Sequence, residues 1–211
     1  MADDTVVDLG ALRIRRKRLA DFPDDYAWRT DPELARYDGA TPIDVPYEQF
    51  AARMEHELRF GDPSRCSFSI ETAEGTHIGN IMYYNAPASR DAAELGMSVA
   101  LPAYRGQGLG TAVMVGFLRY LWASTSFRVL ALRTLDWNAA AIAAFRRAGF
   151  SETGLETSAA PRMVGMAARR EWWLLWDSEG RFEAALARAR DWRPAAGASA
   201  PISPGPSAAP R

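Results

Sequence analysis

The sequence contains one cysteine, Cys66, and only two histidines, His56 and His77. A single cysteine excludes an internal disulfide framework, and the isolated histidines give no spacing typical of a metal site, so no metal is expected. The formal net charge of -1 provides no general attraction to nucleic acid or to an anionic membrane. No apolar run is long enough to span a bilayer, and the acidic N-terminus lacks the regions of a signal peptide. These absences favour a cytoplasmic protein.

The length and the composition suit one globular domain with an appendage. The chain has 211 residues, of which 48% are hydrophobic and 24% are charged, values that are ordinary for a soluble domain. We expect a domain over residues 1–177 and a C-terminal helix over residues 178–193. Residues 194–211 are rich in Ala, Pro, Ser and Gly, and their composition predicts disorder.

A change of hydrophobic period occurs in the middle of the chain. Residues 94–101 alternate between apolar and polar or small side chains, which predicts a strand, and Pro102 ends it. From Gly110 to Trp122 the apolar side chains recur every three or four residues, which predicts a helix. Between the two lies a loop, Arg105-Gly106-Gln107-Gly108-Leu109-Gly110.

This loop is suited to binding phosphate. Three glycines on alternate positions let the backbone turn sharply and approach a ligand. Free N–H groups at the start of the following helix attract an anion, and Arg105 adds a positive charge. The loop is not a Walker A loop, which ends in Gly-Lys-Ser or Gly-Lys-Thr. It is not the dinucleotide fingerprint either, because Thr111 stands where that pattern requires glycine. A plain glycine-rich turn is the remaining alternative.

The rest of the chain alternates between helix and strand signals after a loose segment over residues 1–10. Helices are predicted over residues 21–28, 31–37, 47–60, 138–148 and 178–192. Strands are predicted over residues 12–19, 66–71, 77–85, 128–135, 150–157 and 171–176.

Three sets of residues resemble a known family. Arg105-x-x-Gly108-x-Gly110, between a strand and an amphipathic helix, resembles the acyl-CoA loop of the GNAT N-acetyltransferase superfamily. Asp136-Trp137-Asn138, followed by Phe145 and Gly149-Phe150, is similar to its second signature. Residues 12–15 and 28–33 resemble the branch of ribosomal-protein N-terminal and antibiotic acetyltransferases. The resemblance implies an α/β fold, in which a mixed, mostly antiparallel sheet of about seven strands, flanked by helices, splays into a V-shaped acyl-CoA cleft.

The same resemblance implies acetyl-CoA as co-substrate and assigns roles to residues. The expected cofactor-binding residues are Val99, Ala100, Leu101, Arg105, Gly106, Gln107, Gly108, Leu109, Gly110, Thr111 and Asn138. The expected substrate-binding residues are Trp28, Tyr37, Tyr83 and Glu94. Glu94 is the expected catalytic base, and the N–H of Val99 would stabilise the oxyanion. Asp38 and Asp136 are the other carboxylates considered as base. Asn138 is expected first to cap a helix.

One departure from the family concerns the acid that protonates the leaving thiolate. Ala141 and Phe145 stand where many members carry Ser or Tyr, so Tyr83, Tyr84 or Tyr104 would have to replace that acid, or none is needed. The expected reaction is direct transfer of an acetyl group to a primary amine of a small molecule or a peptide N-terminus. The alternatives are a non-catalytic acyl-CoA binder, a longer acyl donor and an unrelated nucleotide-phosphate binder. Trp172, Trp173 and Trp176 would line an acceptor pocket, pack the last strand or form a homodimer face.

Overall fold

The computed structural model describes residues 4–157 and 160–193. In this part of the chain, eight strands form one sheet in the order β1-β2-β3-β4-β5-β6-β8-β7. The strands are β1 (Thr5–Asp8), β2 (Leu12–Arg16), β3 (Cys66–Thr72), β4 (His77–Tyr84), β5 (Ala92–Val99), β6 (Val129–Leu135), β7 (Ser151–Glu156) and β8 (Met163–Arg169). The pair β5–β6 is parallel and the other neighbours are antiparallel. The predicted mixed, mostly antiparallel sheet is confirmed.

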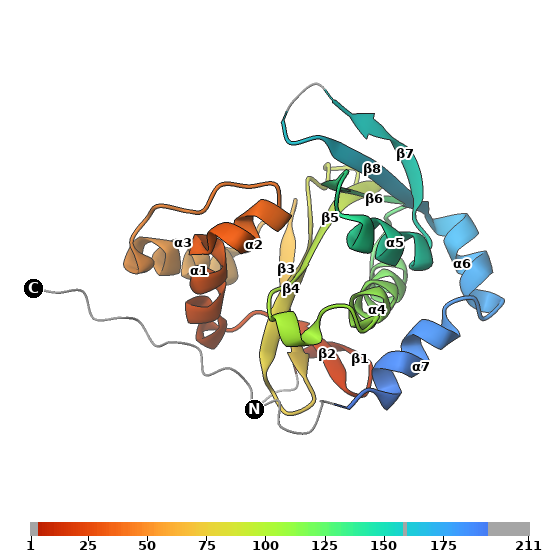
Figure 1. Ribbon diagram of the computed structural model, residues 1–211, viewed down its shortest axis with the longest axis horizontal. Helices are drawn as coiled ribbons and strands as arrows, with labels where there is room; N and C mark the ends of the chain where they lie inside the picture. The colour runs from red at the N-terminus through yellow and green to blue at the C-terminus, as the bar shows by residue number, and fades with distance from the viewer. Residues whose placement is uncertain (1–3, 158–159, 194–211) are drawn as a thin grey trace, which may run out of the picture.

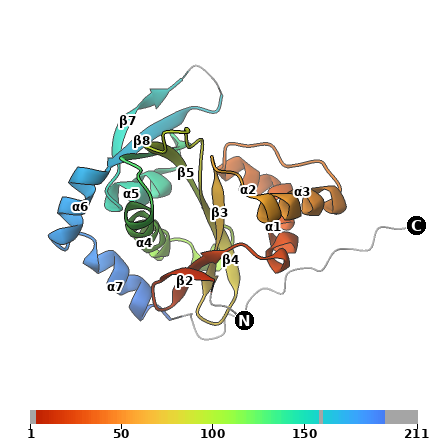
Figure 2. The same ribbon diagram turned by 180° about the vertical axis from the view of Figure 1, so that it is seen from behind.

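Helices cover both faces of this sheet (Figures 1 and 2). One group lies on one face and consists of α1 (Phe22–Thr30), α2 (Pro32–Tyr37) and α3 (Tyr47–Phe60). The second group lies on the other side and consists of α4 (Leu109–Ser124), α5 (Ala139–Arg147), α6 (Arg170–Ser178) and α7 (Glu183–Asp191). Short 3₁₀ turns, η1 (Leu19–Asp21) and η2 (Pro102–Tyr104), precede α1 and the glycine loop. Among the described helices, none combines the length and the apolar content needed to cross a membrane.

The hydrophobic core surrounds α4, the helix that follows the glycine loop. Val113, Phe117 and Leu121 on this helix are fully buried, and the ring of Phe117 meets that of Phe68 on β3 edge-on, with centroids 5.3 Å apart. The helix also packs against α7, α5, β1 and β2. The first turn of α4 is therefore fixed relative to the sheet.

A buried ionic cluster attaches the start of α1 to the sheet. Arg15 on β2 donates two hydrogen bonds to Asp21, at 2.7 and 2.8 Å, and a further one to Glu71 on β3. The hydroxyl of Ser69 donates to the same Asp21 carboxylate at 2.7 Å. Burial alone would raise the pKa of Asp21, but the bonds from Arg15 and Ser69 hold it well below its ordinary value.

Two predicted regions near the ends of the chain were wrong. The segment expected to be loose contains β1, which pairs with β2 as an eighth strand. Residues 171–176, predicted as the last strand, lie in α6, where Trp173 is fully buried and Trp172 is 57% exposed. The run of large apolar side chains resembles a strand, but burial follows a helical period because one face of α6 packs on the core. The last strand is β8, which pairs with both β6 and β7.

The expected C-terminal helix over residues 178–193 corresponds to α7 alone, which begins later than predicted. α6 ends at Ser178, and Gly180, with φ of +78°, turns the chain before α7 begins at Glu183. The other predicted helices and strands are present, with ends that differ by a few residues. The predicted disordered tail, residues 194–211, lies outside the described residues.

Candidate functional site

The strands β5 and β6 separate part-way along their length. They pair only between residues 92–95 and 129–132, after which β5 stays with β4 to Val99 and β6 stays with β8 to Leu135. The N–H of Ala100 donates to Ile78 at 2.8 Å. Because neighbouring peptide groups in a strand point in opposite directions, the N–H of Val99 is directed away from β4, into the gap. The expected wedge is present beside the strand that the sequence indicated.

The glycine loop leads from this strand to the first turn of α4. Gly106 and Gly108 adopt φ angles of +72° and +80°, which favour glycine, and Gly108 is the N-cap of the helix. The first N–H groups of a helix have no partner within it. Thr111, in the same turn, is 4% exposed, and its hydroxyl has no hydrogen-bond partner among the described residues. The turn therefore presents buried donors to an anion.

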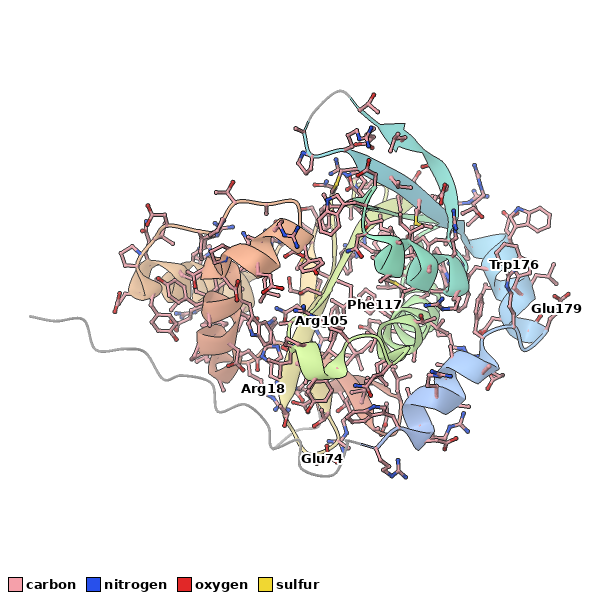
Figure 3. The ribbon with its side chains drawn as sticks, viewed as in Figure 1. Arg18, Glu74, Arg105, Phe117, Trp176 and Glu179 are labelled. Atoms are coloured by element: carbon pink, nitrogen blue, oxygen red, sulfur yellow. The ribbon has the colours of Figure 1, made fainter. Side chains whose placement is uncertain are left out.

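Arg105 connects the loop to the end of β5. Its guanidinium donates to the carbonyl of Val99 at 2.8 Å and to that of Ala100, and lies 5.7 Å from the ring of Tyr37 on α2. Figure 3 places it near the middle of the molecule, between the two groups of helices. The residue expected to supply charge for a phosphate thus also fixes the shape of the loop.

Two cavities meet at the gap between β5 and β6. The loop cavity, of about 610 Å³, lies against the glycine loop, β5, α1 and α5. The outer cavity, of about 530 Å³, lies between β5 and β6 and reaches β8. Both are lined by Arg29, Tyr37, Asp38, Met97, Ser98, Asn138, Ala141 and Phe145. The two cavities are therefore contiguous at the end of the wedge, within the size range of small-molecule sites.

A family model described as an acetyltransferase (GNAT) domain matches residues 11–151. The chain belongs to the GNAT acetyltransferase family. It is therefore an acyl-CoA-dependent acetyltransferase, as the resemblance in the sequence indicated.

Several solved GNAT structures have the same fold. Spermidine N-acetyltransferase from Vibrio cholerae, in complex with CoA and spermine, is 16% identical, covers 78% of this chain and 98% of its own, and has a TM-score of 0.70. RimJ from Mycobacterium smegmatis, in complex with CoA-disulfide, is 20% identical over 83% of this chain and 92% of its own, with a TM-score of 0.66. The aminoglycoside acetyltransferase AAC(6')-Ib, in complex with coenzyme A, is 18% identical over 82% of this chain and 98% of its own, with a TM-score of 0.63. At these identities the likeness shows the fold alone.

Most of the expected cofactor-binding residues of this GNAT chain line the loop cavity. They are Val99, Ala100, Arg105, Gly106, Gly108, Gly110, Thr111 and Asn138. Leu101, Gln107 and Leu109 do not line it, since Leu109 is buried in the core and Gln107 is bonded to Trp192 and Ala103. Asn138 also caps α5, as expected, by accepting from the N–H of Ala141 at 3.1 Å.

The expected substrate-binding aromatics occupy different places. Trp28 lines the loop cavity, with its ring 4.6 Å from that of His77, and Tyr37 lines both cavities. Tyr83 lines neither, because its ring packs on Phe127 with centroids 5.4 Å apart. Its neighbour Tyr84 points to the opposite face of β4 and lines the outer cavity.

Glu94, the expected base, lies at the closed end of the wedge. It lines neither cavity, and its carboxylate accepts from Asn85 at 3.1 Å and from Arg133 at 3.3 Å. Tyr84, also hydrogen-bonded to Glu94, connects it to the outer cavity. Asp136, on the turn after β6, pairs with Arg162 at 2.7 Å. Both carboxylates are thus held by arginines.

Asp38 is placed differently, at the end of α2, where the two cavities join. Among residues 4–157 and 160–193, no cation lies within 4 Å of its carboxylate. The residue as a whole remains open to solvent, but partial burial of the carboxyl raises its pKa, against the opposing effect of Arg29 and Arg105. Nothing in the local sequence marks Arg29, which lines both cavities and was not predicted.

The two positions at which many family members carry the acid that protonates the thiolate have apolar side chains here, and both face the cavities. Ala141 and Phe145 line both cavities. Tyr104 lines the loop cavity, and burial and nearby Glu74 raise its pKa. Burial and Glu94 raise the pKa of Tyr84, in the outer cavity. Both phenols are therefore protonated at neutral pH and able to donate a proton.

The C-terminal helix α7, beyond the matched residues, supports the glycine loop. The indole of Trp192 donates to the side chain of Gln107, and its ring lies 5.5 Å from that of Tyr104. The side chain of Arg188 passes so close to Gly108 that a Cβ there would lie 2.7 Å from its Cδ. The sequence predicted this helix but did not indicate that it contacts the glycine loop. The three tryptophans of α6 line neither cavity.

Proposed function

We propose that this GNAT enzyme is an N-acetyltransferase that moves the acetyl group of acetyl-CoA directly to a primary amine of a small molecule or a peptide N-terminus. The observation that carries the proposal is that two cavities meet beside the N–H of Val99, which is directed into the gap between β5 and β6. The loop cavity has a phosphate-binding loop at one end, and the outer cavity offers separate space for an acceptor. Both substrates would then be bound at once, with no covalent enzyme intermediate.

The residues of the loop cavity fit acetyl-CoA. The N–H groups of residues 109–111 and the unpaired hydroxyl of Thr111 would hold the diphosphate. The peptide groups of Met97 and Val99 have no strand partner on the side of the wedge and would pair with the amides of the pantetheine arm. When bound, acetyl-CoA supplies an acetyl group as a thioester. The N–H of Val99 would donate to the thioester oxygen and stabilise the charge that develops there.

The attacking amine must be neutral, although a free primary amine is mostly protonated at pH 7. Two carboxylates are available as proton acceptor: Glu94, which the sequence predicts, and Asp38. We favour Asp38, because it lines both cavities and no cation is paired with it among the described residues. Its raised pKa also brings it closer to the range in which a general base is effective. Glu94 does not line the outer cavity itself, although its partners Tyr84 and Arg133 do.

The leaving thiol needs little assistance. A thiol has a pKa near about 8.5, so thiolate is a tolerable leaving group. Either Tyr104 or Tyr84 would return a proton to it, since both phenols line a cavity. The absent acid at residues 141 and 145 also agrees with a second candidate function, that of a non-catalytic acyl-CoA binder.

A thiol-release assay with acetyl-CoA and a panel of amines tests the proposal. We expect CoA to bind with micromolar affinity, and we expect amine-dependent thiol release. Binding of CoA without release on any amine would favour the non-catalytic binder. Faster release from succinyl-CoA than from acetyl-CoA would indicate a longer acyl donor. Absence of CoA binding, or displacement of CoA by ATP, would refute the assignment of the loop cavity.

A further inference from the structure

The charges that line the outer cavity balance. Among the described lining residues they are Arg29, Arg133, Asp38 and Glu156. Arg133 lies 3.6 Å from Glu156 and 3.3 Å from Glu94, so these groups neutralise one another at one end. Asp38 is then the carboxylate that remains for a ligand, and it is one group, not a row of acids.

The uncharged side chains around the outer cavity include a cluster of apolar ones. Four methionines, on β4, β5, α4 and β8, face it together with leucines of β5 and β6 and with Phe145. The methionines are Met82, Met97, Met114 and Met163. Methionine is flexible and polarizable, and it packs against aromatic and aliphatic groups of varied shape. This end of the cavity suits a body without charge.

We propose that the acceptor carries a single primary amine on an apolar or aromatic body. This inference rests on the proposed function and names its substrate class. The ammonium group would pair with Asp38, where the outer cavity meets the loop cavity, and the apolar body would lie among the methionines. Asp38 would first take one proton from the ammonium group, and the neutral amine would then attack the thioester carbon. As the C–S bond breaks, the second proton of the nitrogen would pass to the leaving thiolate, so that the amide and free CoA are formed.

A polyamine or an aminoglycoside fits this cavity poorly. Each has several ammonium groups, and every one beyond the first would have to compete with Arg133 for Glu156 or be desolvated without a carboxylate. Arg29, which lines both cavities, would repel the additional charges. The solved spermidine and aminoglycoside acetyltransferases share the fold with this chain, but the proposed acceptor differs from theirs in charge.

The test is a comparison of kcat/KM at saturating acetyl-CoA. The acceptors are phenethylamine, tryptamine, a tripeptide with N-terminal phenylalanine, spermidine and kanamycin. We expect at least one of the first three to exceed both polycations by tenfold or more. The small amines and the tripeptide distinguish a metabolite from a peptide N-terminus. A preference for spermidine or kanamycin would overturn the proposal. No release with any amine would instead count against the proposed function.

A pair of variants makes the test specific to the cavity. Met163 on β8 is half-buried at the edge of the outer cavity. Met163→Glu adds a carboxylate there, and we expect it to raise the ratio of kcat/KM for spermidine to that for phenethylamine by at least fivefold. Met163→Leu, a change of similar volume, should leave the ratio as it is. Thermal unfolding checks that both variants are folded. If they are, an equal ratio of the two kcat/KM values in both variants would show that this cavity does not bind the acceptor.

Discussion

Alanine substitutions at Gly106 and Gly108 test whether the loop conformation is used to bind CoA. Both residues have positive φ angles, and an L-residue in this region costs about 1–2 kcal/mol. At Gly106 an added Cβ meets no atom within 4 Å, so the backbone strain is the whole cost. At Gly108 the Cβ would also lie 2.7 Å from Cδ of Arg188, which must move. Gly106→Ala is thus a matched control for strain alone.

In these alanine variants, the loop without CoA is expected to relax away from its positive φ angles. The backbone strain then lowers the affinity for CoA. Binding must then restore the strained conformation, and 1–2 kcal/mol corresponds to roughly 5–30-fold weaker binding. Titration calorimetry with CoA measures this loss of affinity. Thermal unfolding detects any part of the strain that instead lowers the stability of the fold. Gly108→Ala should lose more than Gly106→Ala. Gly108→Val, with a β-branched side chain at the same φ, should abolish measurable binding.

A double variant separates strain from the contact with α7. In an Arg188→Ala background, Gly108→Ala should cost no more than Gly106→Ala does, because the three atoms nearest to its Cβ all belong to the side chain of Arg188. Wild-type CoA affinity and stability in both single alanine variants would refute the reasoning. It would mean that the loop neither needs its glycine conformations nor binds the diphosphate.

Three further predictions concern the base, the ionic cluster and α7. Asp38→Asn should lower kcat/KM by at least tenfold with CoA affinity unchanged, and Glu94→Gln should lower it less; the reverse order would return the role of base to Glu94. Because burial raises the pKa of Asp38, its ionised form destabilises the fold above that pKa, so Asp38→Asn should raise the unfolding temperature at pH 8 and not at pH 3. Asp21→Asn should cost about 3 kcal/mol of unfolding free energy in urea at pH 7, since it breaks a buried ion pair with Arg15. The pKa of Asp21 is lowered, so that difference should shrink as the pH falls below about 4, and a pH-independent difference would contradict the account. Trp192→Phe removes a hydrogen bond worth about 1 kcal/mol and should weaken CoA binding severalfold, whereas wild-type affinity would show that α7 does not position the loop.

Features that depend on neighbouring residues were predictable from the sequence. The glycines of the loop need their conformations for local reasons, and Asn138 caps the helix that follows it directly. The alternation in β5 and the period of α4 are likewise local patterns. These signals placed the strand, the loop and the helix that we propose bind the cofactor within a few residues of where they lie.

Features that depend on distant contacts were not predictable in this way. β8 contains glycine and alanine, and it is a strand because it pairs with β6 and β7 on both sides. Tyr83 and Tyr84 differ by one position, which places them on opposite faces of β4. The meeting of Arg29 and Asp38 at the junction of two cavities depends on how α1 and α2 lie on the sheet, which no local pattern records.

The contact between α7 and the glycine loop has a consequence for how much of the chain is needed for activity. The matched region ends at Phe150-Ser151, yet Phe182, Leu186 and Ala189 complete the core beside α4, and Trp192 anchors the loop. A protein shortened to residues 11–151 would leave the turn proposed to bind the diphosphate without its contacts to α7 and Trp192. If this turn binds acetyl-CoA as proposed, the part of the chain needed for catalysis is larger than the matched region and includes α7.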